Sequence, residues 1–170
     1  MDTLRTETFV RYSRPSTSAA CLVFDADDTL AVYDKELRLG GCDRFAPRPE
    51  LTLAQTAVNH GYDIVVATAR PCWTATRTLK WLRRHNLPVA ALYLKNRENW
   101  TVEAAELKVG MLRDIQGTWR VEAFYDDSPA NCLAARDFGV NTVYVPGNEA
   151  YWRSKGQVPP PDGFLRLNRR

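Results

Sequence analysis

The segment CLVFDADDTL, from Cys21 to Leu30, places a group of aspartates directly after a short apolar run. The run ends at Asp25, and Asp27 follows two positions later. A short, wholly apolar run is typical of a strand that is buried on both faces of a parallel sheet. In open α/β sheets, reactive side chains gather at the carboxyl ends of such strands. We therefore take Asp25 and Asp27 as the first candidates for a functional site.

Four further runs along the chain have the same character and predict four more strands. They are YDIVVAT (62–68), VAALYL (89–94), VEAFYDD (121–127) and VNTVYV (140–145). Helices are expected between the strands over residues 50–60, 73–85, 101–115 and 128–138. The first begins after a proline and the last at a Ser-Pro pair, and a glycine follows each of the two. Strands that alternate with helices predict right-handed βαβ crossovers, and therefore a three-layer α/β domain with a mainly parallel sheet.

Length and composition are those of an ordinary soluble protein. The 170 residues are enough for one buried core, so we expect a single domain over 1–170, with its core at about 20–147 and an extension at each end. No apolar run approaches the roughly 20 residues that cross a bilayer. Because the N-terminus also has no apolar leader, we expect a cytoplasmic protein with no membrane partner. The four cysteines form no CxxC pair, which favours structural thiols over zinc binding or disulfides.

Carboxylates follow several of the predicted strands. Asp25 ends the first strand, Thr68 the second, and Asp126 and Asp127 the fourth. With Asp27, four carboxylates would meet at one edge of the sheet and repel each other unless they shared a cation. Any single aspartate could instead cap a turn or helix. The complete set favours a metal site, and oxygen ligands at a water-accessible edge suit Mg²⁺ better than zinc or copper.

Three of these stretches resemble motifs of the haloacid dehalogenase-like (HAD) superfamily. FDADDTL, which contains Asp25 and Asp27, is similar to the first motif of that superfamily. VVATAR resembles the second, with Thr68 at the hydroxyl position, and FYDDSP resembles the fourth, with Asp126 and Asp127. The ordered match covers residues from about 21 to 146 and implies a HAD-like, Rossmann-like domain.

The third motif of the superfamily is a lone lysine, for which the sequence offers two candidates. Lys108 is the better match, because it lies near the start of a predicted helix about one βα unit before the fourth motif. Lys95 is the competitor, although it follows a strand directly.

The resemblance implies a phosphatase with an aspartyl-phosphate intermediate. Asp25 would attack phosphorus, and Asp27 would protonate the leaving oxygen and later deprotonate the attacking water. Thr68 would donate to a phosphoryl oxygen, and Lys108 would offset the negative charge around Asp25. Superfamily members that cleave carbon–halogen or carbon–phosphorus bonds usually lack the second aspartate, so Asp27 favours hydrolysis of phosphate esters.

The same resemblance implies a set of Mg²⁺ ligands. The ion would be held by the Asp25 carboxylate, the main-chain carbonyl of Asp27 and the Asp126 carboxylate. Asp127 would orient a water molecule bound to the metal.

The sequence leaves little room for a cap domain over this site. Between the first and second motifs there is space for a short flap, AVYDKELRLG, and one helix. Between the second motif and Lys108 there is space for one helix, one strand and a loop. A nearly uncapped site suits the end of a large substrate, or a partner that covers it.

Basic residues interleaved with aromatic ones occur in TATRTLKWLRRHN, residues 74–86. This composition suits nucleic-acid backbones and unpaired bases, and Arg83 and Arg84 are the candidate contacts. The alternative is a solvated amphipathic helix that turns Leu79, Trp81 and Leu82 to the core.

A closer likeness favours nucleic acid. The order of elements resembles that of the phosphatase domain of phage polynucleotide kinase-phosphatases, which remove 3′-phosphates. In this chain the order is GYDIVVATARP, a strand, LKNRENW, a helix with the lysine and then the DD pair. That likeness implies that Arg70 and Arg97 contact the substrate phosphate or its neighbour. No GxxxxGK[ST] phosphate-binding loop occurs in the chain, so no 5′-kinase activity is expected.

Two other functions stay open at this point. One is a phosphatase of mononucleotides or other small phosphate esters. The other belongs to a different class, a phosphate-binding module without turnover, although a binder has no need of a general acid such as Asp27. The sequence therefore predicts a Mg²⁺-dependent phosphomonoesterase whose partner is a phosphorylated substrate, with a nucleic-acid 3′ end as the favoured one.

Overall fold

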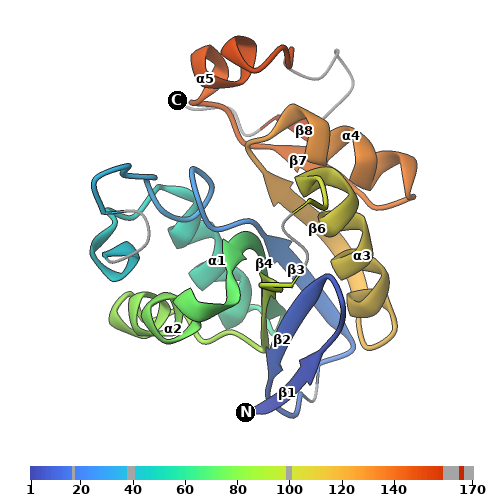
Figure 1. Cartoon of the computed structure of the whole chain (residues 1–170). Helices are drawn as coiled ribbons and strands as arrows, with labels where there is room; N and C mark the ends of the chain where they lie inside the picture. Colours follow the sequence, from blue (N-terminus) through green and yellow to red (C-terminus); the bar gives the residue numbers. More distant parts are fainter. Residues whose placement is uncertain (17, 38–40, 99–100, 159–164, 167–170) are drawn as a thin grey trace.

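The computed structural model describes residues 1–16, 18–37, 41–98, 101–158 and 165–166, which form a three-layer α/β fold (Figure 1). Its sheet has the strand order β1-β2-β5-β4-β3-β6-β7-β8, and all pairs from β5 to β8 are parallel. The strands are β1 (Asp2–Arg5), β2 (Phe9–Ser13), β3 (Ala20–Phe24), β4 (Asp63–Pro71), β5 (Ala91–Lys95), β6 (Arg120–Asp126), β7 (Thr142–Tyr144) and β8 (Leu165–Arg166). The predicted mainly parallel α/β sheet is thus confirmed.

Helices cover both faces of the sheet. They are α1 (Glu50–Asn59), α2 (Ala75–Arg84), α3 (Ala104–Gln116), α4 (Pro129–Asp137) and the short α5 (Glu149–Ser154). One apolar core joins α1 and α2 to the sheet, and another joins α3 and α4 to its opposite face. Figure 1 shows the two helix pairs on either side of the strands. Each face therefore buries its own set of side chains, which is why the strands are apolar on both sides.

Local signals fix the ends of the predicted helices. The hydroxyl of Ser128 accepts a hydrogen bond from the main-chain nitrogen of Asn131, and Pro129 occupies the first turn of α4. Gly61 and Gly139 follow α1 and α4 with φ angles of 85° and 92°, a left-handed conformation that glycine adopts without steric cost. The four helices lie within a few residues of the predicted ranges.

Three elements were not expected from the sequence. The β1–β2 hairpin pairs antiparallel with β5 and extends the sheet on one side, and β8 extends it on the other. The helix α5 follows β7 in the segment expected as the C-terminal extension. These elements are short, and their attachment depends on residues that are distant in the sequence, so no local pattern predicts them.

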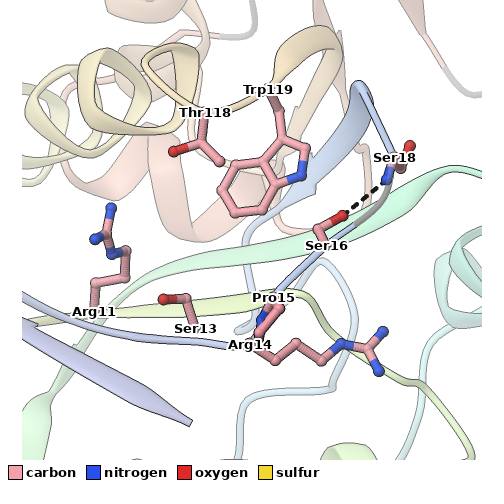
Figure 2. A pocket seen from close by; sticks show the side chains of 8 residues that line it. All are labelled: Arg11, Ser13, Arg14, Pro15, Ser16, Ser18, Thr118 and Trp119. Carbon is pink, nitrogen blue, oxygen red and sulfur yellow. Dashed lines mark hydrogen bonds between the residues drawn. The ribbon is translucent and has the colours of Figure 1, made fainter.

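A cavity of about 240 Å³ lies beside the hairpin, between Arg11, Ser13, Pro15 and Trp119 among others (Figure 2). Ser13 pairs with Ala91, the first residue of β5, so this cavity is at the amino ends of the parallel strands. Reactive residues of such sheets collect at the opposite edge. The cavity is therefore not the candidate active site.

Two further features bear on the environment of the protein. Within the described residues, no helix combines the length and the apolar character that a membrane crossing requires. All four cysteines are free thiols, and three of them are buried, as expected for structural cysteines.

Candidate active site

The strand β3 lies in the middle of the parallel sheet, between β4 and β6. The chain proceeds from β3 outward to β4 and β5, then returns to the other side of β3 as β6. Such a reversal of strand order opens a crevice at the carboxyl ends of the strands, where ligands bind in open α/β folds. Asp25, Thr68 and Asp126 lie at the carboxyl ends of these three neighbouring strands. The structure therefore brings these predicted residues to one place.

Thr68 lies where β4 departs from regular pairing. The register between β4 and β5 shifts between Ala67 and Pro71, which marks a bulge-like irregularity over Thr68 to Arg70. Irregularities of this kind re-aim side chains at the rims of sheets. The hydroxyl oxygen of Thr68 is buried and accepts a hydrogen bond of 3.2 Å from the main-chain nitrogen of Arg70.

Lys108 supplies the positive charge of the site. Its ammonium group, on α3, contacts Asp25 Oδ1, Asp126 Oδ2 at 3.1 Å and the main-chain oxygen of Ala67. The side chain is 1% exposed, so water contributes little to its solvation. Burial opposes the charge of this lysine, but the neighbouring carboxylates of Asp126 and Asp25 outweigh that effect and raise its pKa. Lys95 instead donates to Val102 O at 2.7 Å, so Lys108 is the lysine at Asp25.

The carboxylates of the site carry more negative charge than Lys108 balances. Burial, with contributions from Asp126 and Asp27, raises the pKa of Asp25 to about 7, although Lys108 acts in the opposite direction. Burial also raises the pKa of Asp127 well above its ordinary value, and the charges of Asp126 and Asp25 add to this effect. Like charges disfavour ionisation of their neighbours. A cation bound among these groups would relieve that repulsion.

Asp27 and Arg70 form an ion pair at the edge of the site, in which two guanidinium nitrogens contact the carboxylate. Arg70 Nε lies 3.0 Å from Asp27 Oδ1 and 3.1 Å from Oδ2, and Nη2 also donates to Oδ1. The guanidinium is buried, donates to Thr78 Oγ1 at 3.1 Å and lies over the ring of Phe45. A planar guanidinium in such a fork fixes the orientation of a carboxylate. Arg70 therefore positions Asp27, and the phosphate contact predicted for it stays a prediction.

The N-terminus of α4 holds Asp126. Its carboxylate accepts hydrogen bonds from the main-chain nitrogen of Ser128 at 2.8 Å and from Asn131 Nδ2 at 3.1 and 3.0 Å. Asn131 was not among the predicted site residues. Its place one helical turn after the DD pair is the signal that could have identified it, because that spacing turns the side chain back toward Asp126.

The donor set fits a hydrated magnesium ion. Within the described ranges, no group of three Asp, Glu, His or Cys side chains is arranged to hold a metal ion. The predicted ligands, however, are two carboxylates, Asp25 and Asp126, and one main-chain oxygen, that of Asp27. In addition, Oδ1 of Asn131 is buried and has no hydrogen-bond partner among the described residues. A water molecule bound to the metal would supply that partner. Oxygen ligands and retained waters are what Mg²⁺ prefers.

Asp127 is held from the C-terminal segment, which the sequence did not predict. Trp152 Nε1 donates to Asp127 Oδ2 at 2.8 Å, and Asn148 Nδ2 lies 3.4 Å from the same oxygen. Asn148 Nδ2 also donates to Asp28 Oδ2 at 2.7 Å. Residues 20 or more positions apart make these contacts, so no motif spacing could reveal them.

The basic residues of α2 do not reach the carboxylates. α2 starts after the carboxyl end of β4 and ends before the amino end of β5, so Arg83 and Arg84 in its last turn lie away from the active edge. Both are exposed, as are Arg77 and Lys80. Trp81 is buried and donates to Phe45 O at 2.7 Å, which agrees with the alternative in which this residue faces the core.

Arg97 is also exposed, but it lies in the turn directly after β5. It is therefore at the same edge of the sheet as the carboxylates. The part of the chain described between β3 and α1 contains loops and a single-turn 3-10 helix, Cys42–Arg44, and no inserted domain. This agrees with the expectation of a nearly uncapped site.

Solved structures with this fold are HAD-like proteins. A protein from Mesorhizobium loti described as a HAD-like phosphatase has a TM-score of 0.68 at 19% identity, over 98% of this chain and 90% of that one. The D,D-heptose 1,7-bisphosphate phosphatase of B. bronchiseptica, solved with magnesium and phosphate, has a TM-score of 0.62 at 17% identity, over 87% and 92%. The fold predicted from the four motifs is thereby confirmed as HAD-like.

A third similar structure is the Pnkp1/Rnl/Hen1 complex, with a TM-score of 0.67 at 17% identity over 76% of this chain. A second structure of that assembly, described as an RNA repair complex, has a TM-score of 0.64 at 20% identity. This chain spans less than half of the matched chain in each, 47% and 44%.

Comparison with family models gives a narrower assignment. The model of the LNS2 domain of PITM 1-3 matches residues 22–145, which is most of the chain and includes all four motifs. The chain belongs to this LNS2 domain family, whose fold is HAD-like. Comparison with curated protein sequences gave no match.

Proposed function

We propose that this chain is a Mg²⁺-dependent phosphomonoesterase that acts through an aspartyl-phosphate on Asp25. The observation that carries the proposal is the arrangement around Asp25. This buried carboxylate at the end of the central strand contacts Lys108, which also contacts Asp126, and Asp27 lies two residues away. A nucleophile, a group that can transfer protons and a fixed positive charge are the parts that phosphoryl transfer requires.

The proposed reaction has two steps. An oxygen of Asp25 attacks phosphorus, the bond from phosphorus to the ester oxygen breaks, and Asp27 in its acid form gives that oxygen a proton. Asp27 then takes a proton from water, whose oxygen attacks the phosphoryl group and frees Asp25 as inorganic phosphate leaves. Thr68 donates to a phosphoryl oxygen in both steps. The contact with Arg70 holds the Asp27 carboxyl group in one orientation for both roles, as acid toward the ester oxygen and then as base toward water.

Magnesium would be held by Asp25, Asp126 and the main-chain oxygen of Asp27, and it would neutralise charge on the phosphoryl group. Asp127 would orient a water of the ion. Neighbouring carboxylates add to burial in raising the pKa values of Asp25 and Asp127, and a cation bound among them would offset that repulsion, which supports this assignment.

A nucleic-acid 3′ end is the substrate that we favour. The described part of the chain has no inserted cap, so a long substrate can reach Asp25. Arg83 and Arg84 are exposed on α2 and lie about 10–15 Å along the helix from its start, at 1.5 Å per residue. They could contact the backbone upstream of the end, while Arg97 and Arg70 could contact the terminal phosphate. The fold shared with a component of an RNA repair complex is consistent with this choice.

A panel of substrates tests both levels of the proposal. Hydrolysis is compared for a 3′-phosphorylated oligonucleotide, a 3′-mononucleotide, a 5′-mononucleotide and para-nitrophenyl phosphate, each with Mg²⁺ and with chelator. We expect Mg²⁺-dependent hydrolysis with the highest kcat/KM for the oligonucleotide. A mononucleotide that matches it at low salt would favour a small-molecule phosphatase. No hydrolysis of any substrate, with phosphate still bound, would favour a binding module.

A further inference from the structure

The segment from Pro146 to Gln157, which includes α5, is attached to the active edge at several points. Arg48 Nη2 donates to Pro146 O at 2.9 Å. Gln157 Oε1 accepts hydrogen bonds from Ala130 N at 3.2 Å and from Ser128 Oγ at 3.3 Å, at the start of α4. Figure 1 shows α5 beyond β7 and α4, at the end of the fold where the parallel strands terminate. The segment therefore borders the site.

Packing alone does not explain this attachment. α5 has six residues and none of them is fully buried, so it contributes little apolar area to either core. Its inward contacts are polar and end on carboxylates. Trp152 donates to Asp127, and Asn148 bridges Asp127 and Asp28. These two side chains therefore connect the segment directly to carboxylates at the active edge.

Both contacts to Asp127 end on the same oxygen, Oδ2. A carboxylate held at one oxygen by an indole N–H and an amide N–H cannot rotate freely. Its other oxygen, Oδ1, makes no hydrogen bond among the described residues and keeps a fixed direction. Partners of this kind orient the groups that surround a metal, and their loss typically lowers metal affinity or activity about 10–100-fold.

We propose that Trp152 and Asn148 are positioning residues, which hold Asp127 so that Oδ1 orients a water of the bound Mg²⁺. This inference rests on the proposed function only in assuming a Mg²⁺ site at Asp25 and Asp126. It assigns a role to a segment outside the four motifs, and it makes the C-terminal segment part of the catalytic centre.

The test is direct binding of Mg²⁺ to the full chain, measured by isothermal titration without substrate. Trp152→Phe keeps an aromatic ring and removes the N–H, so its Mg²⁺ affinity should fall roughly tenfold. Tyr151→Phe is the matched control, because Tyr151 is exposed on the same helix, and its affinity should equal that of the wild type. Equal affinity of Trp152→Phe and wild type would overturn the inference, as would an equal loss in Tyr151→Phe.

A second readout needs no variant that might fail to fold. In a ¹H–¹⁵N spectrum of the wild-type chain, the indole N–H signal of Trp152, identified by side-chain assignment, should shift when Mg²⁺ is added. An unchanged signal at saturating Mg²⁺ would overturn the inference. Asn148→Ala should also weaken Mg²⁺ binding, and unchanged affinity in that variant would remove Asn148 from the proposal.

The outcomes separate this inference from the proposed function. If the wild-type chain binds Mg²⁺ and hydrolyses substrate, and Trp152→Phe changes neither, the proposed phosphatase function stands and the positioning role is refuted. Wild-type chain that binds no Mg²⁺ would refute both.

Discussion

The replacement Lys108→Met tests the electrostatics of the site most fully. Lys108 is 1% exposed and contacts two carboxylates, Asp25 and Asp126. Removal of one partner from a buried ion pair typically costs about 3–5 kcal/mol, because the remaining charge is left without compensation. In a chain of this size, 1 kcal/mol shifts Tm by roughly 2–4 °C, so we expect Tm to fall by about 10 °C.

The loss should depend on pH in a defined direction when Mg²⁺ is removed with chelator. Lys108 lowers the pKa of Asp25, so in Lys108→Met that pKa rises further from its wild-type value of about 7. Near neutral pH the folded variant then binds more protons than the folded wild type, whereas the unfolded chains bind equal numbers at this aspartate. Its stability therefore falls more steeply as pH rises, and the deficit relative to wild type should be larger at pH 8 than at pH 6.

Thermal denaturation followed by circular dichroism, together with hydrolysis of para-nitrophenyl phosphate, measures both effects. Lys95→Met is the matched control, because Lys95 bonds a main-chain oxygen at 2.7 Å and contacts neither carboxylate. It should change stability by about 1 kcal/mol or less and retain activity. Activity in Lys108→Met close to that of the wild type, or a deficit that shrinks as pH rises, would refute the reasoning.

Three further results are expected. Asp27→Asn should lower kcat by roughly 10²–10⁴, the usual contribution of general acid–base catalysis, and a kcat within a factor of two of wild type would be inconsistent with its role. Asp126→Ala should raise the Mg²⁺ concentration that gives the half-maximal rate. If the wild-type chain kept its full activity after exhaustive dialysis against chelator, a metal requirement would be excluded. Replacement of Arg83 and Arg84 by Gln should lower kcat/KM for the oligonucleotide and barely change that for para-nitrophenyl phosphate. For the oligonucleotide, the slope of log kcat/KM against log salt concentration should also become less steep in the double variant, by about 0.7 per lost phosphate contact. An unchanged slope would show that these arginines do not contact the nucleic-acid backbone.

The strand and helix pattern of the sequence predicts much of the fold and the convergence of the carboxylates. Asp25, Thr68 and Asp126 were expected together because parallel strands place their carboxyl ends at one edge, and the structure has them there. The ambiguity between Lys108 and Lys95 required three-dimensional information. Only the packing of α3 against the sheet decides which ammonium group reaches Asp25.

Contacts between distant segments could not be predicted from the sequence. The bond from Trp152 to Asp127 joins residues 25 positions apart, and that from Asn148 to Asp28 joins residues 120 apart. Such contacts depend on the path of the chain after β7, which no local periodicity specifies. The pairing of Arg70 with Asp27 is hidden for the same reason, because it depends on how the end of β4 turns toward the loop after β3.

Detection of a phosphoryl group on Asp25 is the most direct test of the account. The wild-type chain is mixed briefly with a phosphomonoester and Mg²⁺, quenched in acid and digested, and the peptide that contains Asp25 is analysed by mass spectrometry. We predict a Mg²⁺-dependent gain of one phosphoryl group on this peptide, and neither the gain nor hydrolysis in Asp25→Asn. Continued hydrolysis by purified, folded Asp25→Asn at even a tenth of the wild-type rate would contradict the central claim.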